Sequence, residues 1–233
     1  MQAHPFGLPP PAKLNQSRPC GVLRGVTPAQ QRRAMAPDED GSVTPFRRLD
    51  GADPTFILII SALALVLFLF RAADIPLTDP DEGRYAEISR EMALSGDWIV
   101  PRLFGIPYLE KPPLLYWLTA TAFLTFGPSQ IAARLAPALA GALGVLLVGA
   151  FARRHLSPAA GTLAAIVLAS TALYVVLART VVTDMLFAVA LSGALFSFFS
   201  YREAATNGGA HVLSFWLFLA GATLSKGPAA LVL

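Results

Sequence analysis

Charged side chains gather in one short stretch of an otherwise apolar chain. Eight acidic residues lie between Arg71 and Lys111, although only 14% of the 233 residues are charged. The stretch reads LTDPDEGRYAEISREMALSGDWIVPRLFGIPYLEKPPLLYWL over residues 77–118. Carboxylates can take a proton from a hydroxyl, and fixed cations can stabilise a negative charge that develops in a reaction. Residues 77–118 are therefore the first candidate for a catalytic site.

The clearest pair of acids is Asp81 and Glu82, which fall in the first turn of a helix predicted over residues 80–95. Asp79 is the expected N-cap of this helix, and Glu82 is its capping-box partner. The positive end of the helix favours an ionised Asp81, and Arg84 lies one turn later, where it can pair with Asp81. An ionised acid suits a base or an electrostatic stabiliser. First-turn acids are also common capping residues, so the spacing leaves both interpretations open.

A second charged pair, Glu110 and Lys111, stands directly before Pro112 and Pro113. The prolines restrict the backbone and so fix where the two charged side chains point. A lysine near an arginine outside the membrane suits a phosphate group. Two solvated loop charges are the simpler interpretation of this spacing.

Two further ionisable residues lie in apolar surroundings. Asp184 occurs in ARTVVTDM and Lys226 occurs in LSKGP. Such groups are costly at membrane depth, which makes them candidates for function. The alternatives are a helix-capping aspartate and a lysine whose head group reaches the membrane surface.

The composition indicates an integral membrane protein. Hydrophobic residues make up 55% of the chain, and the mean hydropathy is +0.56. A soluble domain carries about 25% charged residues. The formal net charge of +3 suits basic cytoplasmic ends better than nucleic-acid binding. The single cysteine, Cys20, excludes an intrachain disulfide, and the three scattered histidines form no metal-binding cluster.

The apolar pattern predicts an all-α membrane protein with five spanning helices. These segments cover about 54–73, 130–152, 158–179, 183–201 and 211–233. The loop between the first two, residues 74–129, is predicted to carry interfacial helices over about 80–95 and 112–126. The second of these has about 15 residues, too few to cross a bilayer at about 1.5 Å per residue.

The two ends of the chain carry different signals. Residues 1–53 lack any apolar period, so we expect a disordered cytoplasmic tail. The chain stops at Leu233 within an apolar run, so we expect an N-terminal fragment of a longer protein that is inactive without the rest.

The distribution of arginines orients the predicted spans. If residues 112–126 do not cross the membrane, Arg153 and Arg154 lie on the cytoplasmic side, in agreement with the positive-inside rule. Asp184 then shares the external side with Asp81. If residues 112–126 do cross, both arginines face outward. The first topology is preferred, with the N-terminus in the cytoplasm and the polar stretch outside.

The polar stretch closely resembles the first external loop of the aminoarabinose lipid A transferases. These enzymes belong with the protein O-mannosyltransferase-like enzymes in the GT-C class of membrane glycosyltransferases. The resemblance rests on the compound pattern DE-x-RYAEI-x-REM, GDWIVP and Y-x-EKPPL-x-YW, and continues more loosely through ARTVVTDM and LSKGP. It implies a GT-C helical bundle, a polyprenyl-phosphate-linked sugar donor, and transfer outside the cytoplasmic membrane of a bacterium.

The resemblance also implies roles for individual residues. Asp81 resembles the acidic catalytic position, with Glu82 beside it, and Asp184 resembles a second acidic position. The residues similar to those that face the donor phosphate are Arg84, Lys111 and Lys226, and those similar to pocket-lining residues are Tyr85 and Tyr108. Glu110 is similar to a metal ligand whose partner would lie beyond Leu233, so a divalent metal is the one cofactor to consider.

These features predict an inverting membrane glycosyltransferase. The sugar would move from a polyprenyl-phosphate donor to a lipid A-like or other envelope acceptor, with membrane lipids as further partners and no nucleic acid. A mannose-type transferase acting on a protein or glycan is the nearest alternative. A transporter or a non-catalytic scaffold is an alternative of another class. Transporters often contain inverted repeats, and the sequence shows none.

Overall fold

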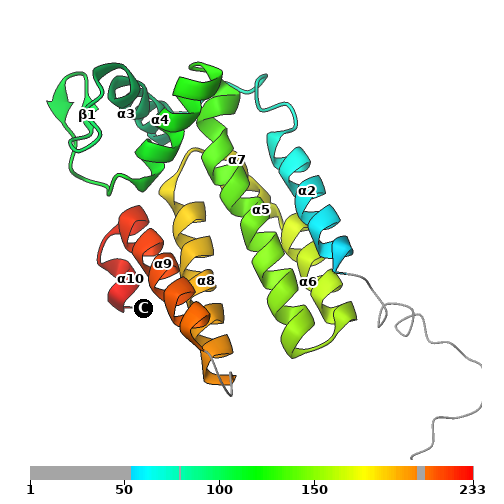
Figure 1. Cartoon of the computed structure of the whole chain (residues 1–233). Helices are drawn as coiled ribbons and strands as arrows, with labels where there is room; N and C mark the ends of the chain where they lie inside the picture. Colours follow the sequence, from blue (N-terminus) through cyan, green and yellow to red (C-terminus); the bar gives the residue numbers. More distant parts are fainter. Residues whose placement is uncertain (1–53, 79, 204–207, 233) are drawn as a thin grey trace, which may run out of the picture. The chain divides into compact units, whose positions relative to one another are not determined.

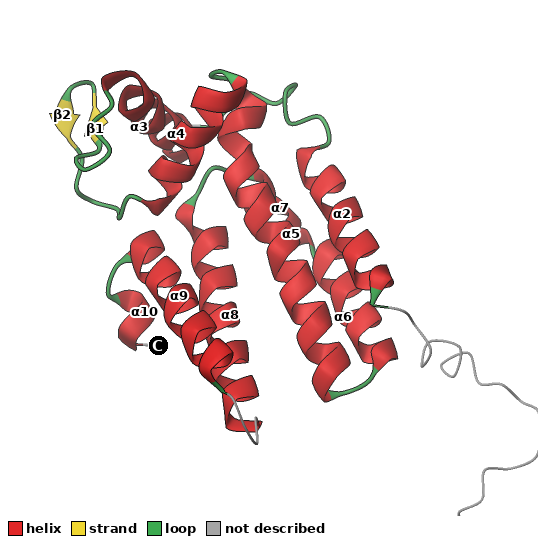
Figure 2. Ribbon diagram, viewed as in Figure 1, coloured by secondary structure: helices red, strands yellow, loops and turns green. Residues whose placement is uncertain are grey.

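The computed structural model describes residues 54–78, 80–203 and 208–232. The predicted tail, residues 1–53, lies outside the described residues. The described chain consists of helices and one short hairpin (Figures 1 and 2). The helices are α2 (Thr55–Leu69), α3 (Asp81–Ser95), α4 (Leu114–Phe126), α5 (Gln130–His155), α6 (Pro158–Ser170), α7 (Ala172–Arg179), α8 (Thr183–Glu203), α9 (Gly209–Lys226) and α10 (Ala229–Val232). The hairpin strands are β1 (Arg102–Leu103) and β2 (Ile106–Pro107).

Two described helices are long and apolar enough to cross a membrane. They are α5 and α8, with mean hydropathies of 2.1 and 1.5, and α6 with α7 makes a third if the bent pair counts as one span. The apolar helices α2 and α4 are shorter, with 15 and 13 residues. The predicted all-α membrane fold is thus confirmed, with shorter first and last apolar helices than the sequence suggested.

The single helix predicted over residues 158–179 is broken. Helices α6 and α7 meet at an angle of 63°, and Thr171 between them has extended backbone angles, φ −67° and ψ 121°. The hydroxyl of Thr171 donates to the Val167 carbonyl at 2.7 Å, and that of Ser170 donates to the Ile166 carbonyl at 2.8 Å. Side-chain bonds of this kind compete with the helical ladder and bend helices.

The last apolar segment is also interrupted. Helix α9 ends at Lys226 because Gly227 has a φ of +71°, a backbone conformation that glycine adopts without strain. A helix predicted to continue to residue 233 therefore turns after Lys226, and α10 begins at Ala229.

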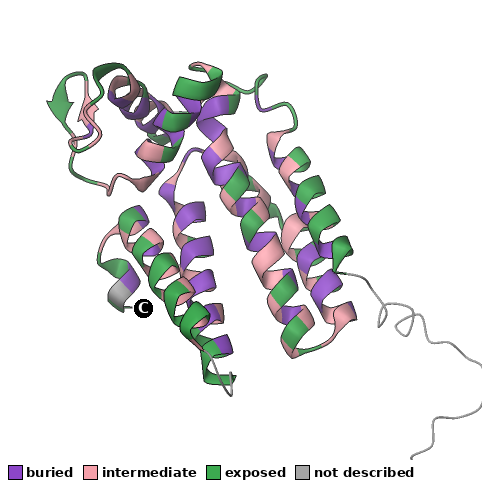
Figure 3. Ribbon diagram, in the orientation of Figure 1, coloured by how far each residue is buried: buried purple, intermediate pink, exposed green. Residues whose placement is uncertain are grey.

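Helix α5 is the central element of the bundle, in contact with α2, α4, α6, α7 and α8. Its contact with α6 is close, because a Cβ added to Gly161 would lie 2.6 Å from the Arg153 Cβ and 2.7 Å from the Gly149 carbonyl oxygen. Small residues permit this approach between membrane helices. The inward faces are buried and the outward faces are exposed (Figure 3), and the outward side chains of α2 include Leu63 and Val66.

The apolar face of α3 is buried inside the protein. Tyr85, Ile88 and Met92, which the sequence places on one face, form a core with Leu115 and Tyr116 of α4. The apolar face of α3 thus packs against α4. The interfacial position predicted for this helix stays a prediction.

The hairpin projects from the loop between α3 and α4 (Figure 1). Its two turn residues, Phe104 and Gly105, both have positive φ angles, 52° and 77°, as in a type I′ turn. The Glu91 carboxylate on α3 accepts hydrogen bonds from their amides at 2.5 and 3.1 Å. One side chain of α3 therefore holds the tip of the hairpin.

Candidate active site

The first turn of α3 is organised around Glu82, which is buried. Its Oε2 accepts hydrogen bonds from the Thr78 amide at 2.9 Å and from the Thr78 hydroxyl at 2.7 Å. Glu82 thus bonds to Thr78, one residue before the Asp79 that was predicted as its capping partner. Asp79 itself lies outside the described residues, and α3 begins at Asp81.

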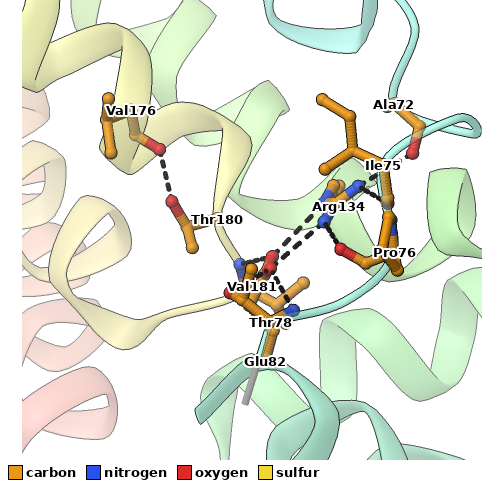
Figure 4. A network of polar contacts seen from close by, with 9 residues as sticks. All are labelled: Ala72, Ile75, Pro76, Thr78, Glu82, Arg134, Val176, Thr180 and Val181. Atoms are coloured by element: carbon orange, nitrogen blue, oxygen red, sulfur yellow. Dashed lines mark hydrogen bonds and ion pairs between the residues drawn. The ribbon is translucent and has the colours of Figure 1, made fainter. Parts of the chain in front are cut away.

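Arg134 of α5 provides the countercharge of Glu82 (Figure 4). Its Nε and Nη2 donate to the two carboxylate oxygens at 3.2 and 3.1 Å, and the two side chains are only 4% and 2% exposed. The remaining donors of Arg134 point at the segment that leads from α2 to α3. They reach the carbonyl oxygens of Ala72 at 2.8 Å, Ile75 at 2.7 Å and Pro76 at 3.0 Å.

The Glu82 carboxylate also accepts a hydrogen bond from the Val181 amide at 2.9 Å. Burial acts to raise the pKa of Glu82, but the hydrogen bonds from Arg134, Thr78 and Val181 together hold the pKa below its ordinary value. Every acceptor direction of this carboxylate is directed at the protein. The catalytic role predicted for Glu82 stays a prediction.

Asp81 is the first residue of α3, and its side chain is exposed. The nearby Arg84 donates to the Tyr108 hydroxyl at 3.5 Å, and this contact, followed by weaker charge effects, raises the pKa of Arg84. The Tyr108 hydroxyl in turn donates to the Glu110 carboxylate at 2.9 Å. A chain of polar groups thus runs from α3 across the hairpin loop to Glu110.

Asp184 and Lys226 form a direct ion pair. The Lys226 Nζ lies 2.5 Å from the Asp184 Oδ1 and 5.5 Å from the centre of the Phe187 ring. Asp184 belongs to the first turn of α8 and Lys226 to the last turn of α9. The two ionisable residues that the sequence places in apolar surroundings therefore form an ion pair.

A cleft of about 420 Å³ joins the end of α9 to the loop before α4. Its lining includes Glu110, Lys111 and Lys226, together with Pro112 and Gly227. The Glu110–Lys111 pair and Lys226 are far apart in the sequence, and the fold brings them to one cavity. Two cations beside carboxylates form an arrangement that can hold a phosphate group at the membrane surface.

Arg84 lines a second cleft, of about 510 Å³, with Leu103 and Phe104. Hydrogen bonds through Tyr108 and Glu110 link this cation to the first cleft. The structure therefore brings Lys111 and Lys226 together and leaves Arg84 at the end of a polar chain.

Tyr85 lies in the core with its ring 5.9 Å from that of Tyr116. Burial raises the pKa of Tyr85, and the charges of Asp81 and, more weakly, Asp184 raise it further. Tyr85 is only 6% exposed, so its role in lining a substrate pocket stays a prediction.

Glu110 does not belong to a metal-binding cluster in the part of the chain that the structure describes. Within residues 54–78, 80–203 and 208–232, no group of three or more His, Cys, Asp and Glu side chains is arranged to hold a metal ion. The metal role of Glu110 stays a prediction.

Arg134 is the site residue that the sequence analysis missed. It occurs within the apolar run QIAARLAPALAG, which was assigned to a spanning helix. An arginine inside such a run is costly unless it is paired. That rule was applied to Asp184 and Lys226, and it could have indicated Arg134 as well.

The described structure defines a helical membrane protein with acidic and basic side chains gathered where the loop before α4 meets α8 and α9. The model of the dolichyl-phosphate-mannose-protein mannosyltransferase family matches residues 55–233. The chain belongs to this family.

Several known proteins resemble the chain. An undecaprenyl phosphate-alpha-4-amino-4-deoxy-L-arabinose arabinosyl transferase from Edwardsiella ictaluri is 38% identical over 151 residues, which cover 63% of this chain and 27% of that protein. One from Aeromonas salmonicida is 46% identical over 88 residues, 38% of this chain and 16% of that protein. The chain thus spans about a quarter or less of the length of these curated relatives.

Solved structures agree in fold. The crystal structure of ArnT from Cupriavidus metallidurans bound to undecaprenyl phosphate has a TM-score of 0.72 and 32% identity, covering 78% of this chain and 34% of that chain. The structure of the same protein in the apo state has a TM-score of 0.67 and 33% identity, and the match covers 76% of this chain and 33% of that chain. These matches confirm the GT-C-type membrane fold.

Proposed function

We propose that the chain is part of an inverting membrane glycosyltransferase that takes its sugar from a polyprenyl-phosphate donor. The observation that carries the proposal is the cleft that Lys111 and Lys226 both line, in a chain similar to a structure that binds undecaprenyl phosphate. The curated relatives are named for transfer from the same lipid carrier.

The proposed reaction is a single displacement at the anomeric carbon of the sugar. The bond between that carbon and the donor phosphate oxygen breaks, and the electron pair leaves with the polyprenyl phosphate. A new bond forms to an acceptor oxygen on the opposite face. Lys111 and Lys226, with Arg84 nearby, stabilise the departing phosphate, because cations fixed before the reaction need no rearrangement as charge develops.

Asp81 is the proposed carboxylate on the acceptor side. If the acceptor is a hydroxyl, Asp81 takes its proton. If the acceptor is a phosphate that is already ionised, Asp81 orients it instead. Asp184 holds Lys226 through their ion pair, and Tyr85 and Tyr108 line the pocket.

The acceptor is proposed to be lipid A or another component of the cell envelope, as in the enzymes that the polar stretch resembles. A mannose-type transfer to a protein is the second candidate, because the matching family model describes that activity. The location proposed is the bacterial cytoplasmic membrane, with the N-terminus in the cytoplasm and the site on the external face. The positive-inside rule supports this orientation.

The test uses the full-length protein in lipid. Release of polyprenyl phosphate would be measured from a panel of lipid-linked sugars, with Asp81→Asn and a matched control, Asp74→Asn. Asp74 is an exposed acid of the same loop that pairs with Arg71. We expect release by the wild type and the control and loss of release with Asp81→Asn, and the panel identifies the sugar. Equal release by all three proteins would remove Asp81 from the mechanism, and no release from any donor would favour a transporter or a scaffold.

A further inference from the structure

The buried carboxylate of Glu82 contacts the two segments that carry Asp81 and Asp184. Asp81 directly precedes Glu82, and Asp184 follows Val181 by three residues. The Glu82 Oε1 accepts the hydrogen bond of the Val181 amide at 2.9 Å, across a sequence separation of 99 residues. The start of α3 and the start of α8 are therefore joined at Glu82.

Arg134 fixes a third segment at the same point. The bonds from Arg134 to the carbonyls of Ala72, Ile75 and Pro76 hold the backbone that leads into α3, while its other donors hold Glu82. Figure 4 shows these segments converging on the two side chains. A fully bonded, buried network of this kind has one arrangement, because any shift leaves a polar group unpaired.

We propose that Glu82 and Arg134 form a positioning pair, which sets the spacing between the Asp81 and Asp184 carboxylates. This inference rests on the function proposed above. Neither side chain of the pair touches the substrate. The pair acts through Asp81, whose placement depends on the first turn of α3, and through Asp184, whose placement depends on the segment that contains Val181.

A purely structural pair predicts a different result from a positioning pair. If the pair only stabilises the fold, its loss reduces the amount of folded protein and affects every variant by the same factor. If it positions Asp81, its loss has little further effect once the Asp81 carboxylate is gone, because residues that act as a unit are not additive.

The kinetic test compares Glu82→Gln with Glu87→Gln in the full-length protein in lipid. Glu87 is a matched control, because it lies on the same helix and pairs with Arg90 at 2.6 Å in a more exposed position. Misplacement by about 1 Å costs about 100-fold in rate, so we expect kcat to fall about 100-fold with Glu82→Gln. We expect KM for the donor to change by less than about threefold, since uniform binding is retained, and the control to retain wild-type kinetics.

The decisive comparison is made in the Asp81→Asn background. We expect Glu82→Gln to lower the residual rate of that variant by less than about threefold. A further loss as large as in the wild-type background would overturn the proposal. So would a restored kcat in Glu82→Gln protein adjusted to the same folded concentration.

A second measurement does not depend on activity. Hydrogen exchange of the Val181 amide would be followed in the wild type, Glu82→Met and Glu87→Met. We expect Glu82→Met to speed this exchange about tenfold or more, because the amide loses its acceptor and opens locally. An unchanged rate would mean that Glu82 does not join the two segments, and the positioning pair would be rejected.

The two measurements separate the two proposals. A wild-type protein that releases no polyprenyl phosphate would overturn the proposed function, while the Val181 exchange would still decide whether the link exists. If Glu82→Met does not fold, the double variant Glu82→Met with Arg134→Met replaces it in the exchange experiment, because it leaves no unpaired charge in the protein interior.

Discussion

Replacing Arg134 by methionine removes the countercharge of a buried carboxylate while keeping an unbranched apolar side chain. In Arg134→Met, Glu82 keeps the hydrogen bonds from Thr78 and Val181 but loses both bonds from the guanidinium. Three backbone carbonyls, those of residues 72, 75 and 76, lose their donor as well. We expect this substitution to be among the most destabilising that a single residue of the described chain permits.

The magnitude follows from the burial of the pair. Breaking a buried ion pair by removing one partner costs about 3–5 kcal/mol. In proteins of about 150–250 residues, each kcal/mol lowers the melting temperature by about 2–4 °C, so the expected fall is about 6–20 °C. The double variant Glu82→Leu with Arg134→Met leaves no charge buried, and it should therefore melt above Arg134→Met.

Arg179→Met is the matched control in this experiment. Arg179 also donates to two carbonyls at the end of α2, those of Leu67 at 2.7 Å and Phe70 at 2.8 Å, and it bonds to no carboxylate. Two such hydrogen bonds contribute about 1–3 kcal/mol, so the control should lose less stability than Arg134→Met. Thermal unfolding of the wild type and these three variants in detergent, followed by gel filtration after heating, measures the differences.

Two results would refute the reasoning. One is a double variant that melts at or below Arg134→Met, because the uncompensated charge would then not be the main cost. The other is a loss in Arg134→Met no greater than in Arg179→Met, because carbonyl contacts would then account for the effect.

Three further predictions concern the same region. Hydrogen bonds hold the pKa of Glu82 in the folded protein below its ordinary value of 4.5. The ionised Glu82 therefore stabilises the fold fully above pH 4.5, and this contribution is lost as the pH falls through the lower pKa of the folded protein. Melting temperatures measured against pH should fall more steeply in acid for the wild type than for Glu82→Gln. Lys226→Gln removes the cation paired with Asp184 and should weaken the binding of polyprenyl phosphate about 10–100-fold, the equivalent of one charged hydrogen bond. Calorimetry measures this affinity, and an unchanged value would remove Lys226 from the donor site. Glu91→Ala removes the acceptor of the amides at the hairpin tip, so chymotrypsin should cleave the bond between Phe104 and Gly105 faster than in the wild type. An unchanged cleavage rate would show that Glu91 does not hold the tip.

Local patterns in the sequence predicted the helices around the site well. Helix α3 was expected over 80–95 and runs over Asp81–Ser95, and α4 was expected over 112–126 and runs over Leu114–Phe126. Proline starts and glycine ends mark both helices, and these signals act within a few residues. The side of the membrane that the charge rule gives for Asp184 stays a prediction.

Features that depend on distant partners were not predictable in the same way. The burial of Glu82 was not predicted, because it depends on Arg134, which lies 52 residues away in the sequence and bonds to it. No pattern within a few residues of the sequence indicates that contact. The bend at Thr171 involves a side-chain hydrogen bond within a segment that is apolar throughout, so hydropathy predicted one helix. The turn at Phe104 and Gly105 is held by Glu91, which lies on α3.

The length of α2 has a consequence for the lipid around the protein. Its 15 residues rise about 22 Å, whereas the hydrocarbon core of a bilayer is about 30 Å thick. A membrane crossed by α2 must become thinner beside it, or polar groups must enter the hydrocarbon at its ends. Arg179 bonds to carbonyls at the end of α2 and is a candidate for such a polar group. If α2 crosses a bilayer, we expect the membrane surface beside it to lie deeper than elsewhere, so that the lipid-linked sugar proposed above would approach the start of α3 from below the level of the surrounding head groups.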